Sequence, residues 1–269
     1  MRGLKGLRWL YWGERFEKRL GWEAHAQRVL TAPILRATAV VGIGRRAELD
    51  FAARFPLAPH FSIPYCCDLS AFFKLRRSSP CGPHLTFLFC GQMIHRKGID
   101  LLFKAFDQLV SCGSRAQLLL LGREAELGSF ISAVSPDARR KIRYLGFQPP
   151  DQLARFFGEA DVFVLPSRYD GWGVVINQAL AAGMPIICSD QVGAGAELVM
   201  NGVNGFVVPA GDPIRLREAM EWFVKNPVAI QPFGSSSRSK ARKLTPQRGA
   251  QEWLHVFERL NQMEPHAAE

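Results

Sequence analysis

The chain has 269 residues, of which 48% are hydrophobic and 22% are charged, an ordinary composition for a globular protein. This length suits one large domain, or one domain with part of a second, and no apolar run is long enough to span a bilayer. The formal net charge of +10 favours anionic partners such as nucleotide phosphates or acidic lipids. The six cysteines form no C-x-x-C pair and have no histidine at zinc spacing, so a reducing cytosol is the simplest setting.

The N-terminal stretch is basic and aromatic. The first 46 residues carry ten Lys or Arg against three Glu, and Trp9, Leu10, Tyr11, Trp12 and Phe16 stand among these charges. There is no continuous apolar core or A-x-A-like site, so the stretch does not resemble a signal peptide. Two interpretations stay open, a solvated basic surface and a segment that lies on a membrane surface.

The first part of the chain predicts a small α/β portion. Helices are expected at 14–30, 31–38 and 45–55, and short strands at 38–43 and 60–64. Residues 64–83 contain three prolines and a basic run, which is typical of a linker. We therefore expect a domain boundary near Pro80, with one domain at 1–80 and a second at 81–269.

Beyond this boundary, strands and helices alternate regularly. The expected strands are 85–90, 117–121, 141–145, 162–166, 185–188 and 205–208. The expected helices are 99–109, 125–134, 150–158, one from 173, 193–200, 212–224 and 246–263. Residues 226–239 look loose. The pattern predicts an α/β fold with a doubly wound parallel sheet.

The most informative stretch is YDGWGVVINQALAAG, at residues 169–183, between two apolar strands. In open parallel sheets, ligands bind where such a loop follows the carboxyl end of a strand. Gly171 and Gly173 permit close approach of a ligand to the backbone, and a helix start suits a phosphate. Asp170 and Gln178 can both reach one ligand, and this pair suits sugar or ribose hydroxyls.

A second loop, GQMIHRKG at residues 91–98, also joins a strand to a helix. Arg96 and Lys97 stand at the helix start, where the helix dipole favours anions. Lys97 can reach a diphosphate as a point charge. A solvated basic turn is the alternative, and His95 is notable only because it lies close to Lys97.

Gly42, Gly44 and Ala47 fit the G-x-G-x-x-A dinucleotide pattern. The preceding strand is short, and the acidic residue expected about 20 residues further on would be Asp68, which lies in the linker. An NAD-dependent oxidoreductase is therefore a minor alternative.

With these motifs, the chain resembles the C-terminal domain of GT-B glycosyltransferases of family 4, also called group 1 glycosyltransferases. The ordered motifs within residues 84–262 are FLFCGQMIHRKGIDLLFKAF, LLLLG, IRYLGFQPPDQLARFFGEADVFVLPSRYDGWGVVINQALAAGMPIICSD and ELVMNGVNGFVVPAGD. The resemblance implies a Rossmann-like GT-B domain that transfers a sugar from a UDP- or GDP-sugar to a glycan or lipid-linked acceptor, with retention and without a metal or other cofactor. It also implies polysaccharide or lipopolysaccharide biosynthesis in the cytoplasm, peripherally at the inner membrane face, with no nucleic-acid partner.

The resemblance implies catalytic roles for Lys97, which would neutralise the leaving diphosphate, and for Asp170, which would contact the donor sugar. The second acid of the family's E-x7-E motif falls on Gln178, which would hold the ribose. The whole implied donor-binding set is Gln92, Arg96, Lys97, Gly146, Phe147, Asp170, Gly171, Trp172, Gly173 and Gln178.

The sequence departs from the family pattern at three points. Gln92 stands where the family has an arginine, so that Arg96 is the cation that would compensate. Asp170 and Gln178 replace two glutamates. Finally, only about 80 residues precede the matched region, where the family has a Rossmann-like domain of well over a hundred. We expect a truncated N-terminal domain, or a partner chain that supplies the acceptor half.

Two main hypotheses follow. The first is a retaining glycosyltransferase. The second is a nucleotide-sugar-binding module or partner subunit with little activity of its own, as suggested by the short N-terminal part and by Gln92 and Gln178.

Overall fold

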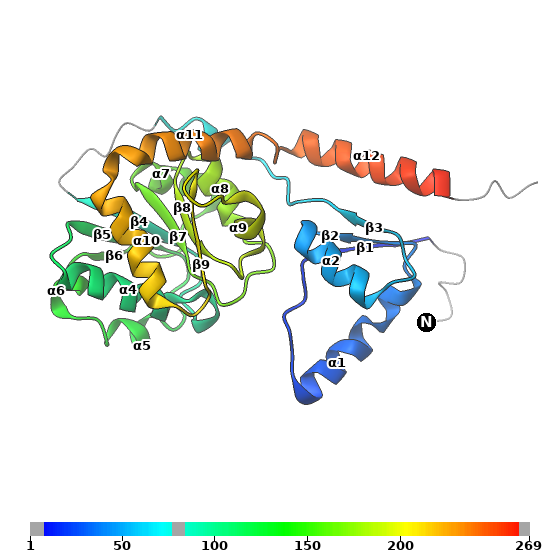
Figure 1. Ribbon diagram of the computed structural model, residues 1–269, viewed down its shortest axis with the longest axis horizontal. Helices are drawn as coiled ribbons and strands as arrows, with labels where there is room; N and C mark the ends of the chain where they lie inside the picture. The colour runs from blue at the N-terminus through cyan, green and yellow to red at the C-terminus, as the bar shows by residue number, and fades with distance from the viewer. Residues whose placement is uncertain (1–7, 77–83, 264–269) are drawn as a thin grey trace, which may run out of the picture. The chain divides into compact units, whose positions relative to one another are not determined.

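The computed structural model describes residues 8–76 and 84–263, which form two compact units (Figure 1). The first unit comprises the described residues up to Cys67 together with those from Leu244 onward, and the second unit runs from Asp68 to Lys243. The boundary expected near Pro80 lies outside the described residues. The final helix, expected in the second domain, belongs to the first unit.

The first unit contains a parallel three-stranded sheet in the order β1-β2-β3. Its elements are β1 (Leu10–Gly13), α1 (Gly21–Thr31), η1 (Ala32–Arg36), β2 (Ala39–Gly42), α2 (Arg45–Arg54), β3 (His60–Ser62) and α12 (Pro246–Met263). Strand β1 was not expected, because four residues among charges show no alternation to identify a strand. The helix expected from residue 14 begins only at Gly21.

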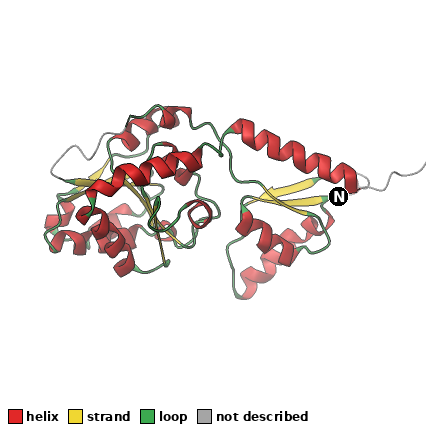
Figure 2. Cartoon of the chain, turned by 45° about the horizontal axis from the view of Figure 1, so that its top comes forward, coloured by secondary structure: helices red, strands yellow, loops and turns green. Residues whose placement is uncertain are grey.

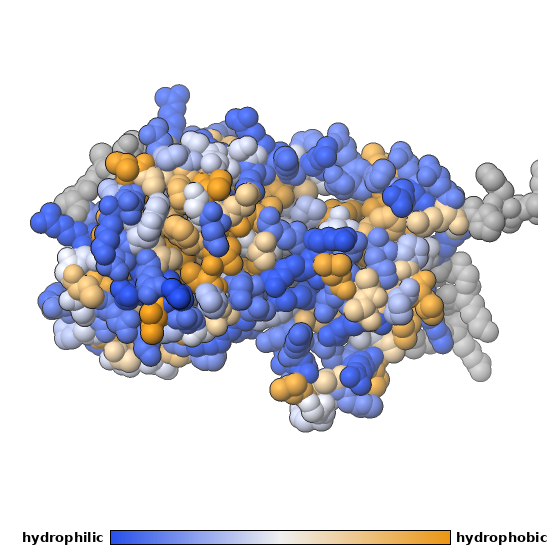
Figure 3. Space-filling view, viewed as in Figure 1, coloured by the Kyte–Doolittle hydropathy of each residue, from blue (hydrophilic) through white to orange (hydrophobic). Residues whose placement is uncertain are grey.

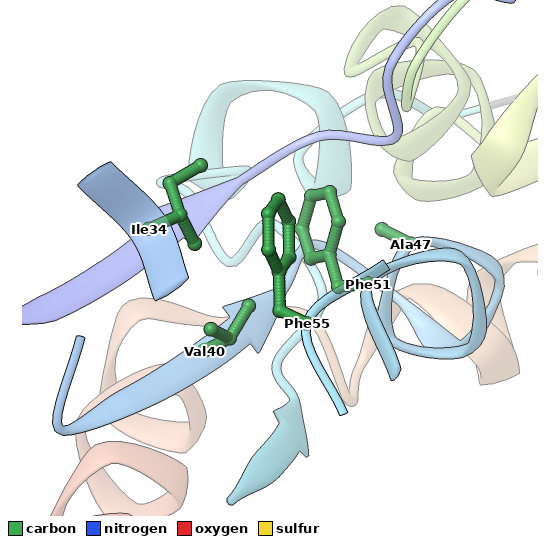
Figure 4. Close-up of a cluster of buried hydrophobic side chains, with 5 residues drawn as sticks. All are labelled: Ile34, Val40, Ala47, Phe51 and Phe55. Carbon is green, nitrogen blue, oxygen red and sulfur yellow. The ribbon is translucent and has the colours of Figure 1, made fainter. Parts of the chain in front are cut away.

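The sheet of the first unit is covered on both faces. Successive side chains of a strand point to opposite faces, so Val40 and Val41 of β2 enter different clusters. Val40 packs with four residues drawn in Figure 4, namely Ile34, Ala47, Phe51 and Phe55. Val41 packs with Ile63 and Val256. Helix α12 therefore supplies part of the core around β2 and β3.

The N-terminal aromatic residues take part in this packing. Tyr11 and Phe16 pack against the cluster around Phe51. The ring of Trp12 makes edge contacts with Tyr65 and Trp253. These side chains therefore help to build the first unit.

Gly42 has a packing role in the first unit. A Cβ on this residue would overlap the backbone of Glu48 in helix α2, so glycine is required where the helix crosses the strand. Gly44 has a φ of +84°, which also favours glycine. The pattern that resembled a dinucleotide fingerprint is thus explained without a dinucleotide.

The second unit contains a parallel six-stranded sheet in the order β6-β5-β4-β7-β8-β9. Figure 2 shows strands in yellow and the helices around them in red. The strands are β4 (Leu85–Cys90), β5 (Ala116–Leu121), β6 (Ile142–Tyr144), β7 (Val162–Leu165), β8 (Ile186–Ser189) and β9 (Gly205–Val208). The α/β fold with a doubly wound parallel sheet is therefore confirmed. Strand β7 is buried along its whole length, as expected for a strand covered on both faces.

The helices of the second unit form two groups. One group is α4 (Ile99–Ser111), α5 (Leu127–Ile131), α6 (Pro136–Arg139) and α10 (Pro213–Lys225). The other is α3 (Ser70–Phe73), α7 (Pro150–Gly158), α8 (Val175–Ala181), α9 (Gly193–Leu198) and α11 (Ile230–Ala241). In these groups, α4 and α8 respectively contact most of the other members. A short helix, η2 (His95–Lys97), precedes α4, and η3 (Pro227–Ala229) precedes α11.

The expectation that residues 226–239 are loose is wrong, because they contain η3 and most of α11. Glycine, proline and four serines give this segment a low intrinsic helix propensity. Tertiary contacts override it: Gly234 lies against the carbonyl of Gly183, and the Ser237 hydroxyl donates to the carbonyl of Met184 at 2.7 Å. The expected linker likewise contains helix α3.

Within residues 8–76 and 84–263, none of the helices combines the length and apolar character that crossing a bilayer requires.

Candidate active site

The candidate site lies where strands β4, β5 and β7 reach the carboxyl edge of the second unit's sheet. The backbones there approach too closely for side chains. A Cβ on Gly122 would overlap the carbonyl of Gly91, and a Cβ on Gly98 would overlap that of Pro166. Gly98 and Gly122 also have φ values of +73° and +132°. Glycine at these positions brings the loops after the three strands together.

Lys97 and Asp170 form the central pair of the site. They lie 73 residues apart in the sequence, yet Lys97 Nζ donates to Asp170 Oδ2 at 2.6 Å. Their side chains are 17% and 10% exposed, so the pair is largely shielded from bulk water. The sequence placed both residues in one site, and the structure brings them into direct contact.

The loop after Asp170 is held by the segment that follows β8. Asp170 N–H donates to Gln191 O at 3.1 Å, and Gly193 N–H donates to Asp170 O at 3.1 Å. Gly173 has a φ of +85°, and helix α8 begins two residues later. Both the N–H and the carbonyl of Asp170 are thus hydrogen-bonded to the segment after β8, which fixes the loop backbone before α8 begins.

Trp172 points into the core and not into the site. Its ring is fully buried, and Nε1 donates to Oδ1 of the buried Asn177 at 3.2 Å. Only its backbone, with that of Gly171, remains for the expected ligand contact. Gln178 is half-buried on α8, and among the described residues its side chain forms no hydrogen bond to Lys97 or Asp170.

The loops after β5 and β6 form a second part of the sheet edge. Gly122 N–H donates to Gly146 O at 2.9 Å, and the Tyr144 hydroxyl donates to Gly122 O at 3.0 Å. Phe147 is 63% exposed, and the guanidinium of Arg123 lies 5.6 Å from its ring centre. This exposed ring is suited to stacking against a planar group.

The glycine-rich loop after β4 places its polar residues differently. Gln92 and His95 are exposed, and His95 N–H donates to Glu126 Oε2 at 3.0 Å. Arg96 Nη1 donates to Tyr169 O at 3.1 Å, so this guanidinium reaches the residue beside Asp170.

The sequence did not identify Arg168 and Asp100. Arg168 forms two 2.7 Å hydrogen bonds to the Asp100 carboxylate. Burial raises the pKa of Asp100, but the hydrogen bonds and charge of Arg168 outweigh it, and the pKa is lowered overall. The available signal was the position of Asp100, three residues after Lys97 in the first turn of α4.

Another polar group without a predicted role is Ser167, which is fully buried at the end of β7. Its carbonyl accepts from the Ser189 hydroxyl at 2.5 Å, while its own Oγ has no hydrogen-bond partner among the described residues. Across residues 8–76 and 84–263, no three His, Cys, Asp or Glu side chains are grouped so that they could hold a metal ion.

A doubly wound parallel sheet with a lysine–aspartate pair and glycine-rich loops at its carboxyl edge places this chain among the α/β proteins, whose ligands bind at that edge. Residues 74–262 match the sequence profile of the family described as "Glycosyl transferases group 1". The match covers most of the chain, and the chain therefore belongs to this family. The minor alternative of an NAD-dependent oxidoreductase is not supported by this match.

Two curated relatives illustrate the likeness. The chain is 29% identical over 177 residues to the phosphatidyl-myo-inositol mannosyltransferase of Mycobacterium leprae. This alignment covers 64% of this chain and 46% of the relative. It is 28% identical over 209 residues to the lipopolysaccharide core biosynthesis mannosyltransferase LpcC of Rhizobium leguminosarum bv. viciae. This second alignment covers 73% of this chain and 58% of the relative. The chain thus spans about half the length of these relatives.

Solved structures show the same fold over nearly the whole chain. Sucrose-phosphate synthase from Thermosynechococcus elongatus aligns with a TM-score of 0.78 and 21% identity, covering 96% of this chain and 69% of that protein. Anabaena Alr3699/HepE in complex with UDP-glucose aligns with a TM-score of 0.74 and 19% identity, covering 95% of this chain and 72% of that protein. The expected GT-B fold is confirmed.

Proposed function

We propose that this chain carries the nucleotide-sugar site of a retaining glycosyltransferase, which transfers a hexose from a UDP- or GDP-sugar to a glycan or lipid-linked acceptor. The observation that carries the proposal is the Lys97–Asp170 pair at the carboxyl edge of the sheet. HepE was solved with UDP-glucose, and a corynebacterial relative is named as GDP-mannose-dependent. These two names support both donor classes.

In the proposed mechanism, the chain binds the donor diphosphate against Lys97. The ammonium group stabilises the negative charge that grows on the departing diphosphate, so that no metal ion is needed for this role. Asp170 accepts hydrogen bonds from donor-sugar hydroxyls and keeps Lys97 oriented. The exposed ring of Phe147 stacks on the base, and Gln178 hydrogen-bonds the ribose.

The test is a calorimetric titration of the chain with UDP, GDP and ADP in EDTA. We expect one nucleotide to bind, and Lys97→Ala to weaken it by about tenfold to a hundredfold, because a charged hydrogen bond contributes about 1.5–3 kcal/mol. Lys104→Ala is the matched control, because Lys104 is an exposed lysine on α4. Equal affinity of the wild type and the Lys97 variant would remove Lys97 from the site.

A second candidate is a nucleotide-sugar-binding module that depends on a partner chain for the acceptor half. The observation that favours it is that Gln178 stands in place of an acid and, within the described residues, forms no hydrogen bond to Lys97 or Asp170. Incubation with UDP- and GDP-sugars separates the candidates. Donor hydrolysis or transfer supports the enzyme, whereas tight binding without turnover supports the module.

We also propose that the protein is cytoplasmic and acts at an anionic membrane surface, through α1 and not through the aromatic stretch before it. Helix α1 buries none of its residues, and Leu20, Trp22 and Leu30 are 86%, 79% and 79% exposed. Figure 3 shows apolar side chains at the lower end of α1. A pocket beside α1 is lined by residues that include Lys18 and Arg28. An apolar helix face with flanking cations suits acidic lipid headgroups.

Vesicle sedimentation checks this surface. We expect binding to vesicles of phosphatidylglycerol and phosphatidylcholine, weak binding to phosphatidylcholine alone, and loss of binding in Trp22→Ser/Leu30→Ser. Leu254→Ser is the control, because Leu254 is 62% exposed on α12, which packs on the other face of the sheet. Equal binding by both variants would refute the role of α1.

A further inference from the structure

Arg168 joins the two loops that carry Lys97 and Asp170. It follows strand β7, two residues before Asp170, and its side chain extends to the segment around η2. Its Nη1 donates to His95 O at 2.7 Å, and its two terminal nitrogens donate to the Asp100 carboxylate at 2.7 Å each. One side chain thus contacts the chain on both sides of Lys97.

The backbone of Arg168 adds a third attachment to the same segment, because its N–H donates to Arg96 O at 2.9 Å. The residues just before Lys97 are therefore held by Arg168, and the first turn of α4 just after it is held through Asp100. The backbone is therefore held on both sides of Lys97. When a ligand binds, only the conformational entropy of the Lys97 side chain remains to be lost.

The charge of Arg168 is already compensated. The fork of the guanidinium matches the two oxygens of Asp100, and the lowered pKa of that carboxyl keeps it ionised at neutral pH. Both side chains are less than one-third exposed. Three of the five guanidinium N–H donors are used in these hydrogen bonds, so the group is suited to holding the loops in place while Lys97 takes the diphosphate.

We infer that Arg168 is a positioning residue that fixes the Lys97-bearing turn against the Asp170 loop and so presets the Lys97–Asp170 pair before the donor binds. The inference rests on the proposed function for the identity of the ligand. The restraint itself is a property of the free protein and can be measured without a ligand. A lysine at this position would keep the charge but lose the fork.

The first experiment compares amide hydrogen exchange in the ligand-free wild type and in Arg168→Gln. We expect severalfold faster exchange in peptides that cover residues 91–99 and 167–173. Arg215→Gln is the matched control, because it removes an exposed arginine–glutamate pair from α10. Unchanged exchange in both peptides of a folded Arg168→Gln protein would overturn the inference, whether or not the chain binds a nucleotide.

The second experiment is a double-mutant cycle with UDP and GDP in the titration. Arg168→Gln is expected to weaken binding about tenfold or more in the wild type, because a misplaced Lys97 loses its contact. In the Lys97→Ala background it should add almost nothing. Additive losses would show that Arg168 contacts the ligand itself and would overturn the inference.

Arg168→Lys separates a local effect on the site from a loss of folding. It retains a cation beside Asp100, so we expect a melting temperature near that of the wild type but a weakened nucleotide affinity. Full affinity in this variant would overturn a role for the guanidinium fork. If the wild type binds neither UDP nor GDP, the proposed function fails, while hydrogen exchange still decides the role of Arg168.

Discussion

At the scale of single residues, the site depends on charges that are paired within the protein. Lys97 and Asp170 contact each other, and Arg168 and Asp100 form a second pair that joins the same two loops. The sequence singled out the first pair because lysine and aspartate follow strand ends. It did not single out the second, although Asp100 stands three residues after Lys97, because a charged residue in a loop or in the first turn of a helix is usually solvated.

Asp100 gives a pH-dependent prediction. Its folded-state pKa is lowered, so its contribution to stability is complete above the unfolded-state pKa and is lost as the pH falls through the folded-state value. We expect Asp100→Asn to reduce the free energy of unfolding by on the order of 1 kcal/mol near neutral pH, with the difference from wild type shrinking below about pH 4.

Urea unfolding at several pH values checks this prediction. The control is Asp137→Asn, because Asp137 forms a largely exposed pair with Arg140. Such a pair contributes little, so this variant should follow the wild type at every pH. A difference for Asp100→Asn that stays constant down to about pH 3 would show that the carboxylate charge has no part in it.

At the scale of elements, strong apolar patterns were easier to predict than segments that depend on partners. Strands β4, β5 and β7 and helices α4 and α7 are where the sequence expected them, because continuous apolar runs and amphipathic spacing are local signals. Helix α11 was missed, since its helical state depends on packing against α8.

Gly234 tests this dependence. A Cβ at this position would overlap the carbonyl of Gly183, which follows the C-terminal end of α8. Gly234→Ala must therefore push α11 away from this end of α8, although alanine has a higher helix propensity than glycine. We expect a loss of about 1–3 kcal/mol in the free energy of unfolding. Ser239→Ala, at an exposed position of the same helix, should be neutral or slightly stabilising. A Gly234→Ala protein as stable as wild type would contradict this close packing.

At the scale of the whole molecule, the chain crosses between its two units twice, near Cys67 and near Leu244. The last helix returns to the first unit, where Val256 packs with Val41 and Ile63. The candidate nucleotide site lies entirely within the second unit. Damage to the first unit's core should therefore leave nucleotide affinity intact.

Val256→Ala tests this separation. We expect about 1–3 kcal/mol less stability in the first unit, read as faster amide exchange in β2 and β3, because a buried side chain leaves a cavity. The affinity for the bound nucleotide should not change. Leu254→Ala, at a 62% exposed position of α12, is the control. A loss of affinity in Val256→Ala alone would show that the units are coupled.

The sequence by itself determined the alternating α/β architecture of the second unit, the loops that carry its site and the family to which the chain belongs. These features rest on local patterns: apolar runs, glycines after strands, and a lysine and an aspartate at loop positions. Only the tertiary structure decided that Lys97 and Asp170 touch, that Arg168 ties their loops together, and that α12 completes the first unit. Each of these depends on segments more than 60 residues apart, and the order of strands that brings them together is not written in any local pattern.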